Sequence, residues 1–228
     1  MSFDENLPPE GFRQRGLAPT ETRLLLIRHG ESYANLNGVA GGPLGDGGLT
    51  DAGRAQARAL ARRLTITKEL ASASALYTST LPRAIETGAI VFPAINPSLE
   101  PTADESLCEL GVGEADGLTW SEIGRRYVAP NWDVNPSQTN VPGGESLLEF
   151  FQRCVDAIER LVARHPRELV VLVVHGGFIE QAMKLYQGLG GGVRMQPRIE
   201  NCSMTEIEFA SDHRRLLRYN DLSPIGVE

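Results

Sequence analysis

Near its N-terminus the chain of 228 residues reads Leu24-Leu25-Leu26-Ile27-Arg28-His29-Gly30. Four apolar residues followed at once by polar ones are typical of a strand that is buried on both faces and delivers its last residues to one edge of a parallel sheet. The strongest β signal, Leu169-Val170-Val171-Leu172-Val173-Val174, ends in the same way, in His175-Gly176-Gly177. The two stretches therefore predict two strands that each end in a His-Gly pair.

Helical patterns alternate with these strands. Thr50 is a candidate N-cap for an alanine-rich helix over residues 51–64, and Ser146 and Glu149 have the form of a capping box before a long helix that ends near Arg164. The other expected elements are a strand over 75–78, a helix from Pro82, a short helix over 120–127, a helix to about Leu185, and late strands over 204–209 and 216–219. Prolines break any long periodicity between Pro93 and Gly144. This order predicts an α/β fold, a three-layer α/β/α sandwich with a mostly parallel central sheet.

Length and composition predict one domain. The segment 1–22 is polar and rich in Pro and Gly, which indicates a flexible arm, and residues 23–228 are enough for one sizeable core.

The longest apolar runs are too short to cross a bilayer. A net charge of −7 disfavours nucleic acid and anionic membranes as partners, because no broad positive field attracts them. The three dispersed cysteines, Cys108, Cys154 and Cys202, are typical of reduced thiols in a cytoplasmic protein.

The two histidines are predicted to lie close together at one edge of the sheet. In open α/β sheets the ligand site lies beyond the carboxyl ends of the strands, so His29 and His175 are expected to converge there. The glycine after each histidine permits close approach of the backbone to an anion, and a helix start nearby supplies free N–H groups. Both features suit an oxyanion.

Around these residues the sequence resembles the histidine phosphatase superfamily, in the branch that contains the cofactor-dependent phosphoglycerate mutases and related phosphatases. Arg28-His29-Gly30 matches its signature. The stretches that accompany it in the expected order are 49–53 (LTDAG), 79–87 (STLPRAIET), 107–110 (LCEL), 142–146 (PGGES) and 174–177 (VHGG). The resemblance covers roughly residues 24 to 209 and implies a phosphoglycerate mutase-like fold.

Phosphoryl transfer then suggests a role for each matched residue. Arg28 and Arg83 present planar forks of donors to the phosphoryl oxygens, and a neutral His29 attacks phosphorus to form a phosphohistidine. By resemblance, His175 donates to the phosphoryl oxygens and Glu109 is the proton donor and later the general base. The residues that the resemblance assigns to substrate binding are Asn35, Gly41, Gly42 and Gly176. No metal or other cofactor is expected, since Arg28, Arg83 and His175 supply the positive charge that a metal ion would otherwise supply.

Three features separate this chain from a true mutase. Ala34 stands where the mutases carry an aromatic residue, and Val112 stands where they carry a tyrosine. The interval between Glu109 and His175 is also shorter than expected for a mutase, and a more open site admits water. Hydrolysis of a phosphomonoester is therefore favoured, with a cofactor-dependent phosphoglycerate mutase as the main alternative and a non-catalytic phosphate-ligand binding protein as another.

Other properties stay open at the level of sequence. The expected substrate is a small phosphorylated metabolite, but residues 112–142 are too irregular to select one, and the protein is expected to be a monomer or homodimer. Arg125 and Arg126 are either an exposed pair or a contact to substrate. The stretch 142–146 is either a turn with a helix cap or part of the ligand site.

Overall fold

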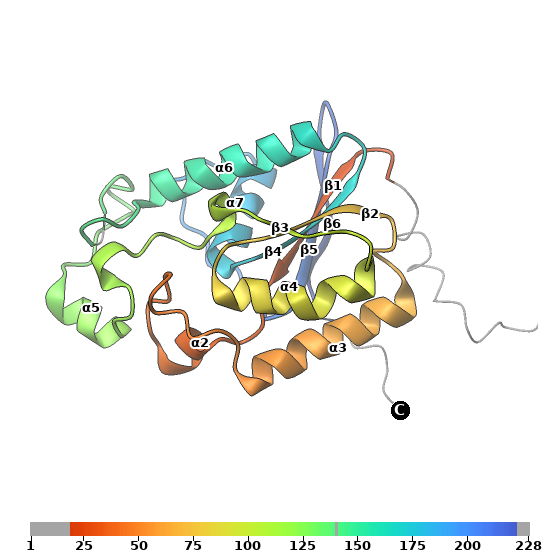
Figure 1. Ribbon diagram of the computed structural model, residues 1–228. Helices are drawn as coiled ribbons and strands as arrows, with labels where there is room; N and C mark the ends of the chain where they lie inside the picture. The colour runs from red at the N-terminus through yellow and green to blue at the C-terminus, as the bar shows by residue number, and fades with distance from the viewer. Residues whose placement is uncertain (1–18, 140, 223–228) are drawn as a thin grey trace, which may run out of the picture.

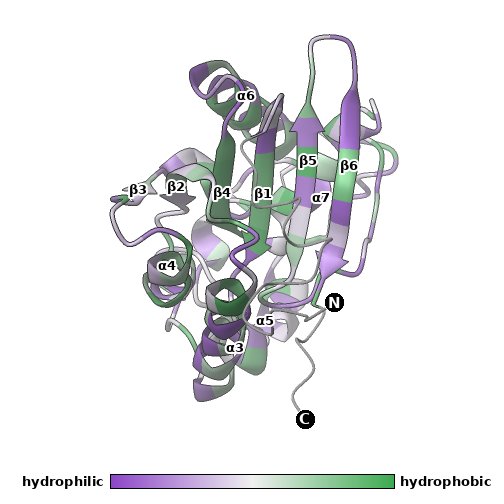
Figure 2. Ribbon diagram, turned by 90° about the vertical axis from the view of Figure 1, so that its right-hand side faces the viewer, coloured by the Kyte–Doolittle hydropathy of each residue, from purple (hydrophilic) through white to green (hydrophobic). Residues whose placement is uncertain are grey.

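The computed structural model of the protein describes residues 19–139 and 141–222. A six-stranded sheet in the order β3-β2-β4-β1-β5-β6 forms its centre (Figures 1 and 2). The strands are β1 (Thr22–Arg28), β2 (Ala73–Thr78), β3 (Thr102–Ala103), β4 (Leu169–Val174), β5 (Met204–Phe209) and β6 (Arg214–Asp221). Of the arm predicted over residues 1–22, residues 1–18 lie outside the described part, and residue 22 is already the first residue of β1.

Four of the strands run parallel. β4 pairs in parallel with both β1 and β2, and β2 with β3, whereas β5 and β6 are antiparallel additions beside β1. The predicted, mostly parallel sheet with late flanking strands is therefore confirmed. In the register of β1 with β4, Arg28 lies opposite Val174, so the residues that follow both strands emerge side by side at one edge.

Helices cover both faces of the sheet. They are α2 (Tyr33–Asn37), α3 (Asp51–Thr67), α4 (Pro82–Ile95), α5 (Trp120–Arg126), α6 (Leu147–Arg164) and α7 (Gly176–Tyr186), with short 3₁₀ turns at Glu105–Leu107 and Gly113–Ala115. α3 and α4 lie against one face, and α6 and α7 against the other (Figure 1). The predicted three-layer sandwich is confirmed. None of the helices in the described ranges is both long enough and apolar enough to cross a bilayer.

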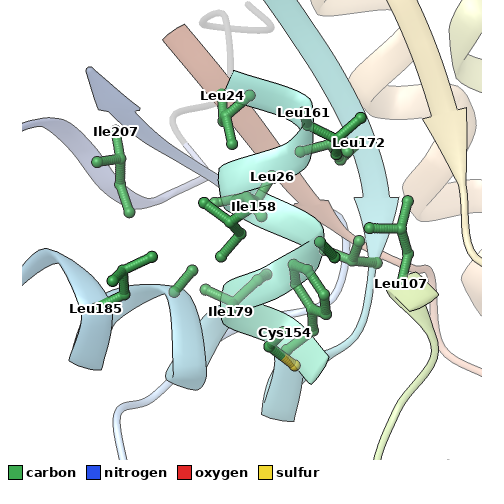
Figure 3. Packing of buried hydrophobic residues seen from close by; sticks show 14 of the residues in the cluster. Leu24, Leu26, Leu107, Cys154, Ile158, Leu161, Leu172, Ile179, Leu185 and Ile207 are labelled. Carbon is green, nitrogen blue, oxygen red and sulfur yellow. The ribbon is translucent and has the colours of Figure 1, made fainter. Parts of the chain in front are cut away.

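Alternate residues of the central strands supply the two cores. Leu24 and Leu26 face α6 and α7, while Leu25 and Ile27 face α3 and α4. Figure 3 shows the first of these cores, with residues of α6 directed at Leu26 and at Leu172 of β4. Because β1 and β4 are covered on both faces, β4 and the middle of β1 are hydrophobic in Figure 2.

The helix ends follow the predicted caps, with small differences. Thr50 accepts the Gly53 N–H at 3.0 Å, and the predicted capping box at the start of α6 is present. α3 runs to Thr67, three residues beyond the expected end. Pro93 lies inside α4, near its C-terminal end. The helix tolerates it there, because the missing N–H of proline removes a single hydrogen bond. The five-residue helix α2 and the two-residue strand β3 are too short to leave a periodic signal.

Candidate active site

A cavity of about 500 Å³ opens where the chain leaves β1 and β4. The predicted site residues in its lining are Arg28, His29, Asn35, Gly41, Arg83, Glu109 and Gly176. His175 is fully buried, and its ring centre lies 5.1 Å from that of His29, with the ring planes inclined by 58°. The predicted convergence of the two histidines is confirmed.

Hydrogen bonds determine which nitrogen of His29 carries the proton. Nδ1 lies 2.7 Å from the Gly30 carbonyl, which only accepts, so Nδ1 is the donor. On the other side Arg83 Nε donates to Nε2 over 3.1 Å, so Nε2 is the acceptor. The backbone carbonyl of His29 accepts a further bond from Asn201 Nδ2 at 2.8 Å. His29 is thus held as the neutral tautomer whose Nε2 lone pair faces a guanidinium.

Arg83, at the start of α4, is oriented by a buried carboxylate. Its Nη1 donates to Asp46 Oδ2 at 2.7 Å and to the Gly41 carbonyl at 2.8 Å, and the Asp46 side chain is fully buried. The Gly48 N–H in turn donates to Asp46 Oδ1 at 2.9 Å. The glycine-rich loop therefore aligns the guanidinium with His29.

Arg28 is the second guanidinium of the site. Its Nη1 donates to the Ile199 carbonyl, and its buried Nε has no partner within the described residues. Burial lowers the pKa of Arg28, and the carboxylates of Glu109 and Glu200 counteract that effect. A half-buried guanidinium whose buried Nε–H is unused, next to His29, suits an anionic ligand.

Ser79 is the hydrogen-bond partner of His175. Its hydroxyl oxygen accepts the Leu81 N–H at 3.1 Å and lies 2.7 Å from His175 Nε2. We assign the single Ser79 proton to His175 Nε2, while Cys108 Sγ lies 3.7 Å from the Ser79 hydroxyl and 3.2 Å from that of Thr80. In a neutral imidazole the other nitrogen carries hydrogen, and His175 Nδ1 is buried without a partner in the described part of the chain. The site thus holds an N–H donor that is ready for an oxygen.

Both histidines are neutral near pH 7. The pKa of His29 lies well below its usual 6.5, because burial removes water and the Arg83 and Arg28 charges oppose a further positive charge. The pKa of His175 is also lowered, by burial first, then by the Arg83 charge, by repulsion from a protonated His29, and by Arg28 and Arg153. An unprotonated His29 is the form that a nucleophile requires.

Glu109 reaches the cavity from the loop after the first 3₁₀ turn. Its Oε2 accepts the Gly177 N–H of α7 at 2.9 Å, and its Oε1 accepts the Leu110 N–H at 3.1 Å. A Cβ at Gly177 would lie 2.1 Å from Oε1, so this close approach requires glycine. Arg153 of α6 donates to the backbone carbonyls of Cys108 and Glu109, which holds this loop in place.

The predicted binding residues differ in what their polar groups do. Asn35 Oδ1 accepts the Ser32 N–H and hydroxyl at the start of α2, and the Gly41 carbonyl accepts from Arg83. The Gly42 N–H donates to Asp116 Oδ1 at 2.9 Å. Gly176 lines the cavity, and a Cβ there would make only an ordinary contact with Arg28. Substrate binding by these four residues stays a prediction.

The structure also shows the surroundings of Gly30, of the stretch 142–146 and of the pair Arg125 and Arg126. A Cβ at Gly30 would lie 2.6 Å from the carbonyl oxygen of Gly53, so this glycine permits close packing against α3. The stretch 142–146 contains Gly143 at φ 72° and the N-cap Ser146, which supports the structural interpretation of that stretch as a turn and a cap. Arg125 and Arg126 are exposed, and Arg125 donates to Ser121 in its own helix.

Sequence reasoning assigned no role in the active site to Asp46, Ser79 or Asn201. Ser79 lies inside a quoted motif, and its position one residue after β2 was the available signal. Asp46 and Asn201 lie in loops without periodic pattern, so only the fold shows their contacts with Arg83 and His29. In residues 19–139 and 141–222 no three His, Cys, Asp or Glu side chains are grouped as metal ligands.

Comparison with known proteins assigns the family. The model of the histidine phosphatase superfamily (branch 1) matches residues 24–222. The chain belongs to this family, which confirms the resemblance of its motifs.

Individual relatives include both phosphatases and a mutase. The metal-independent phosphoserine phosphatase of Arabidopsis thaliana is 33% identical over 210 residues, 90% of this chain and 84% of that protein. The 2,3-bisphosphoglycerate-dependent phosphoglycerate mutase of Methylobacterium sp. (strain 4-46) is 32% identical over 179 residues, 74% of this chain and 82% of that protein. The solved structure of Bacillus stearothermophilus YhfR is 29% identical with a TM-score of 0.76, covering 90% of this chain and 100% of that one. Overall identity therefore does not separate the two activities.

Proposed function

We propose that the protein is a metal-independent phosphomonoester hydrolase that acts through a phosphohistidine on His29. The observation that carries this proposal is the state of His29, which is neutral and tied through Nδ1 to Gly30, with its Nε2 lone pair facing Arg83. A fixed imidazole lone pair beside two guanidinium groups suits attack on a phosphate dianion.

In the first step, His29 Nε2 forms a bond to phosphorus as the ester oxygen leaves. Arg28 and Arg83 neutralise the phosphoryl oxygens, and Arg83 Nε transfers its hydrogen bond from His29 to one of them. The Nδ1–H of His175 donates to another oxygen. Glu109, which lines the same cavity, protonates the departing alkoxide.

In the second step, water attacks the phosphohistidine. The Glu109 carboxylate accepts the proton of that water, the N–P bond breaks, and inorganic phosphate leaves while His29 returns to its neutral form. The Gly177 N–H that binds Glu109 keeps the carboxylate at the cavity through both steps. The cycle needs no metal, because the two guanidinium groups supply the charge.

A phosphoglycerate mutase is the second candidate, favoured by the relative that carries this name. It would use the same intermediate but return the phosphoryl group to a substrate hydroxyl. Ala34 and Val112, which line the cavity at positions where mutases carry larger aromatic side chains, favour water as the acceptor.

The cysteines of the protein bear on its cellular setting. Cys108, Cys154 and Cys202 are all free thiols, and Cys154 and Cys202 are buried. Free thiols are usual in a reducing compartment, so we propose a cytoplasmic enzyme that works as a monomer or homodimer on a small phosphorylated metabolite.

The test is phosphate release from a panel of phosphomonoesters in the presence of EDTA. We expect release to resist EDTA, to be lost in His29→Ala, and to persist in His213→Ala, which changes an exposed histidine. Rapid quenching with labelled substrate should trap an acid-labile, base-stable phosphoprotein in the wild type only. EDTA-sensitive release that persists in His29→Ala would overturn the mechanism. Bisphosphoglycerate-stimulated isomerisation without net release would establish the mutase, and phosphate binding without turnover would establish a binding protein.

A further inference from the structure

The cavity changes its chemical character away from His29. Beyond Glu109 its wall is formed by Leu110, Val112, Trp120 and Trp132. The same four residues also line an adjoining cavity of about 280 Å³, whose other side includes Ile123 and Val141. The cavity that contains His29 and Glu109 therefore includes an apolar wall, beside polar side chains such as Asn35, Gln181 and Gln196.

This apolar wall is built into the fold. Ala40, Ala115, Ile123 and Val141 form a small separate core beneath it, and Val112 packs against that core. Trp132 Nε1 donates to the Gln138 carbonyl at 2.8 Å, which fixes the indole within its loop. The wall is thus assembled before a ligand arrives, as in most small-molecule sites.

Trp120 is a large aromatic residue that is mostly exposed to solvent at the cavity. It is the first residue of α5, it is 60% exposed, and it lines both cavities. A large aromatic side chain left in water beside a phosphate site is a feature of ligand surfaces, because its burial by a ligand stabilises the complex.

The charges around the cavity disfavour a second anionic group on the substrate. In the described lining the cations are Arg28, Arg83 and Arg194. The first two are occupied by the phosphoryl group, and Arg194 is exposed and pairs with Asp133 at 3.7 Å. Two acidic residues, Glu109 and Glu180, line the same space; Glu109 is neutral while it acts as the proton donor, and Glu180 pairs with Lys184 at 3.2 Å. For a second anionic group the described lining thus leaves the exposed Arg194, whereas the wall of Leu110, Val112, Trp120 and Trp132 offers a large apolar surface.

We propose that the preferred substrates are phosphate monoesters whose alcohol carries an apolar group, either a ring or a medium-length chain, seated against Trp120 and Trp132. This inference rests on the proposed phosphatase activity and deepens it. Short, hydroxyl-rich or carboxylated esters are turned over poorly, since they leave the apolar wall in contact with water.

The first experiment uses ethyl, butyl, hexyl and octyl phosphate beside glycerol 1-phosphate. All are esters of primary alcohols, so their intrinsic reactivities are close and differences in kcat/KM report binding of the alcohol part. We expect kcat/KM to rise up to about fourfold per added methylene until the space is filled, the factor for transfer of one methylene out of water. A flat series, or glycerol 1-phosphate ahead of butyl phosphate, would overturn the inference while the phosphatase stands. No release from any of these esters or from the wider panel would overturn the proposed function instead.

The second experiment locates the preference at the wall. Trp120→Ala should lower kcat/KM for hexyl phosphate by about tenfold and change that for ethyl phosphate by less than about twofold, because only the longer chain reaches the indole. Trp120→Phe should restore most of the hexyl activity. The matched control is Val128→Ala, on the same segment but 86% exposed and outside the lining. Equal losses with both esters, at unchanged Tm, would remove Trp120 from the proposed subsite.

Discussion

The phosphoryl end of the cavity and its apolar mouth are built in different ways. At the phosphoryl end, His29, Arg83 and His175 stand at strand ends or in the first turn of a helix, and hydrogen bonds orient each of them, while His175 Nδ1 has no partner in the described residues. At the mouth, Trp120 and Trp132 belong to the excursion between β3 and α6, which has only a small core of its own. The sheet thus positions the chemistry, and the excursion surrounds the leaving group. Substitutions at the first region should affect all esters equally, and those at the second only some.

The largest effect is expected for Arg83→Lys. A lysine supplies one point charge and cannot bind His29, Gly41 and Asp46 together, so kcat/KM should fall by about 10² to 10³ for short and long esters alike. Steady-state kinetics on ethyl and hexyl phosphate measure this, with Arg58→Lys on the exposed face of α3 as the control. A loss limited to one ester would contradict the division between the two regions.

Ser79→Ala should have the next largest effect. Without the hydroxyl, His175 is free to place its proton on Nε2, and the donor that faces the phosphoryl group is lost in part of the molecules. We expect kcat/KM to fall about tenfold to hundredfold for all esters, a usual range for residues that orient a functional group.

The tautomer of His175 can be measured from the ¹⁵N chemical shifts of its two ring nitrogens. These shifts should indicate a proton on Nδ1 in the wild type and a mixture of the Nδ1–H and Nε2–H tautomers in Ser79→Ala. A general loss of packing would not produce this change. Ser98→Ala, at an exposed serine, is the control. An unchanged tautomer with full activity in Ser79→Ala would remove Ser79 from the mechanism.

The phosphoryl end should also control stability in mild acid. In the unfolded chain His29 and His175 take up protons near pH 6.5, whereas in the folded protein their lowered pKa values keep them neutral. Below pH 6.5 the unfolded state therefore binds more protons, and the free energy of unfolding falls by about 1.4 kcal/mol per pH unit for each histidine. Urea unfolding between pH 7.5 and 5 should show this decline, and His29→Gln should remove about half of it. Constant stability down to pH 5 would show that the two rings protonate freely in the folded protein.

The smallest effect is expected for the pair Arg125→Ala and Arg126→Ala. Both side chains are exposed on α5 and lie outside the lining of the cavity, and solvent and salt screen their charges. Combined replacement should change kcat/KM by less than about twofold for any ester at physiological ionic strength. A larger loss would show that substrate also contacts the C-terminal end of α5.

The elements and the site were predictable from the sequence to different degrees. The strands ending at Arg28 and Val174 and the capped helices α3 and α6 were found because apolar periodicity and caps are local signals. The motif residues were found through their resemblance to a family. Asp46 and Ser79 were not assigned roles, since their functions depend on contacts with residues 37 and 96 positions away.

By itself the sequence determined the order of strands and helices, the family, and the residues expected to meet around a phosphoryl group, because each of these depends on neighbouring residues or on a short motif. Only the tertiary structure decided which histidine nitrogen holds the proton, which carboxylate orients Arg83, and that an apolar wall faces the leaving group. Those properties arise from hydrogen bonds and packing between loops distant in the chain, where no periodic pattern exists for a sequence to display.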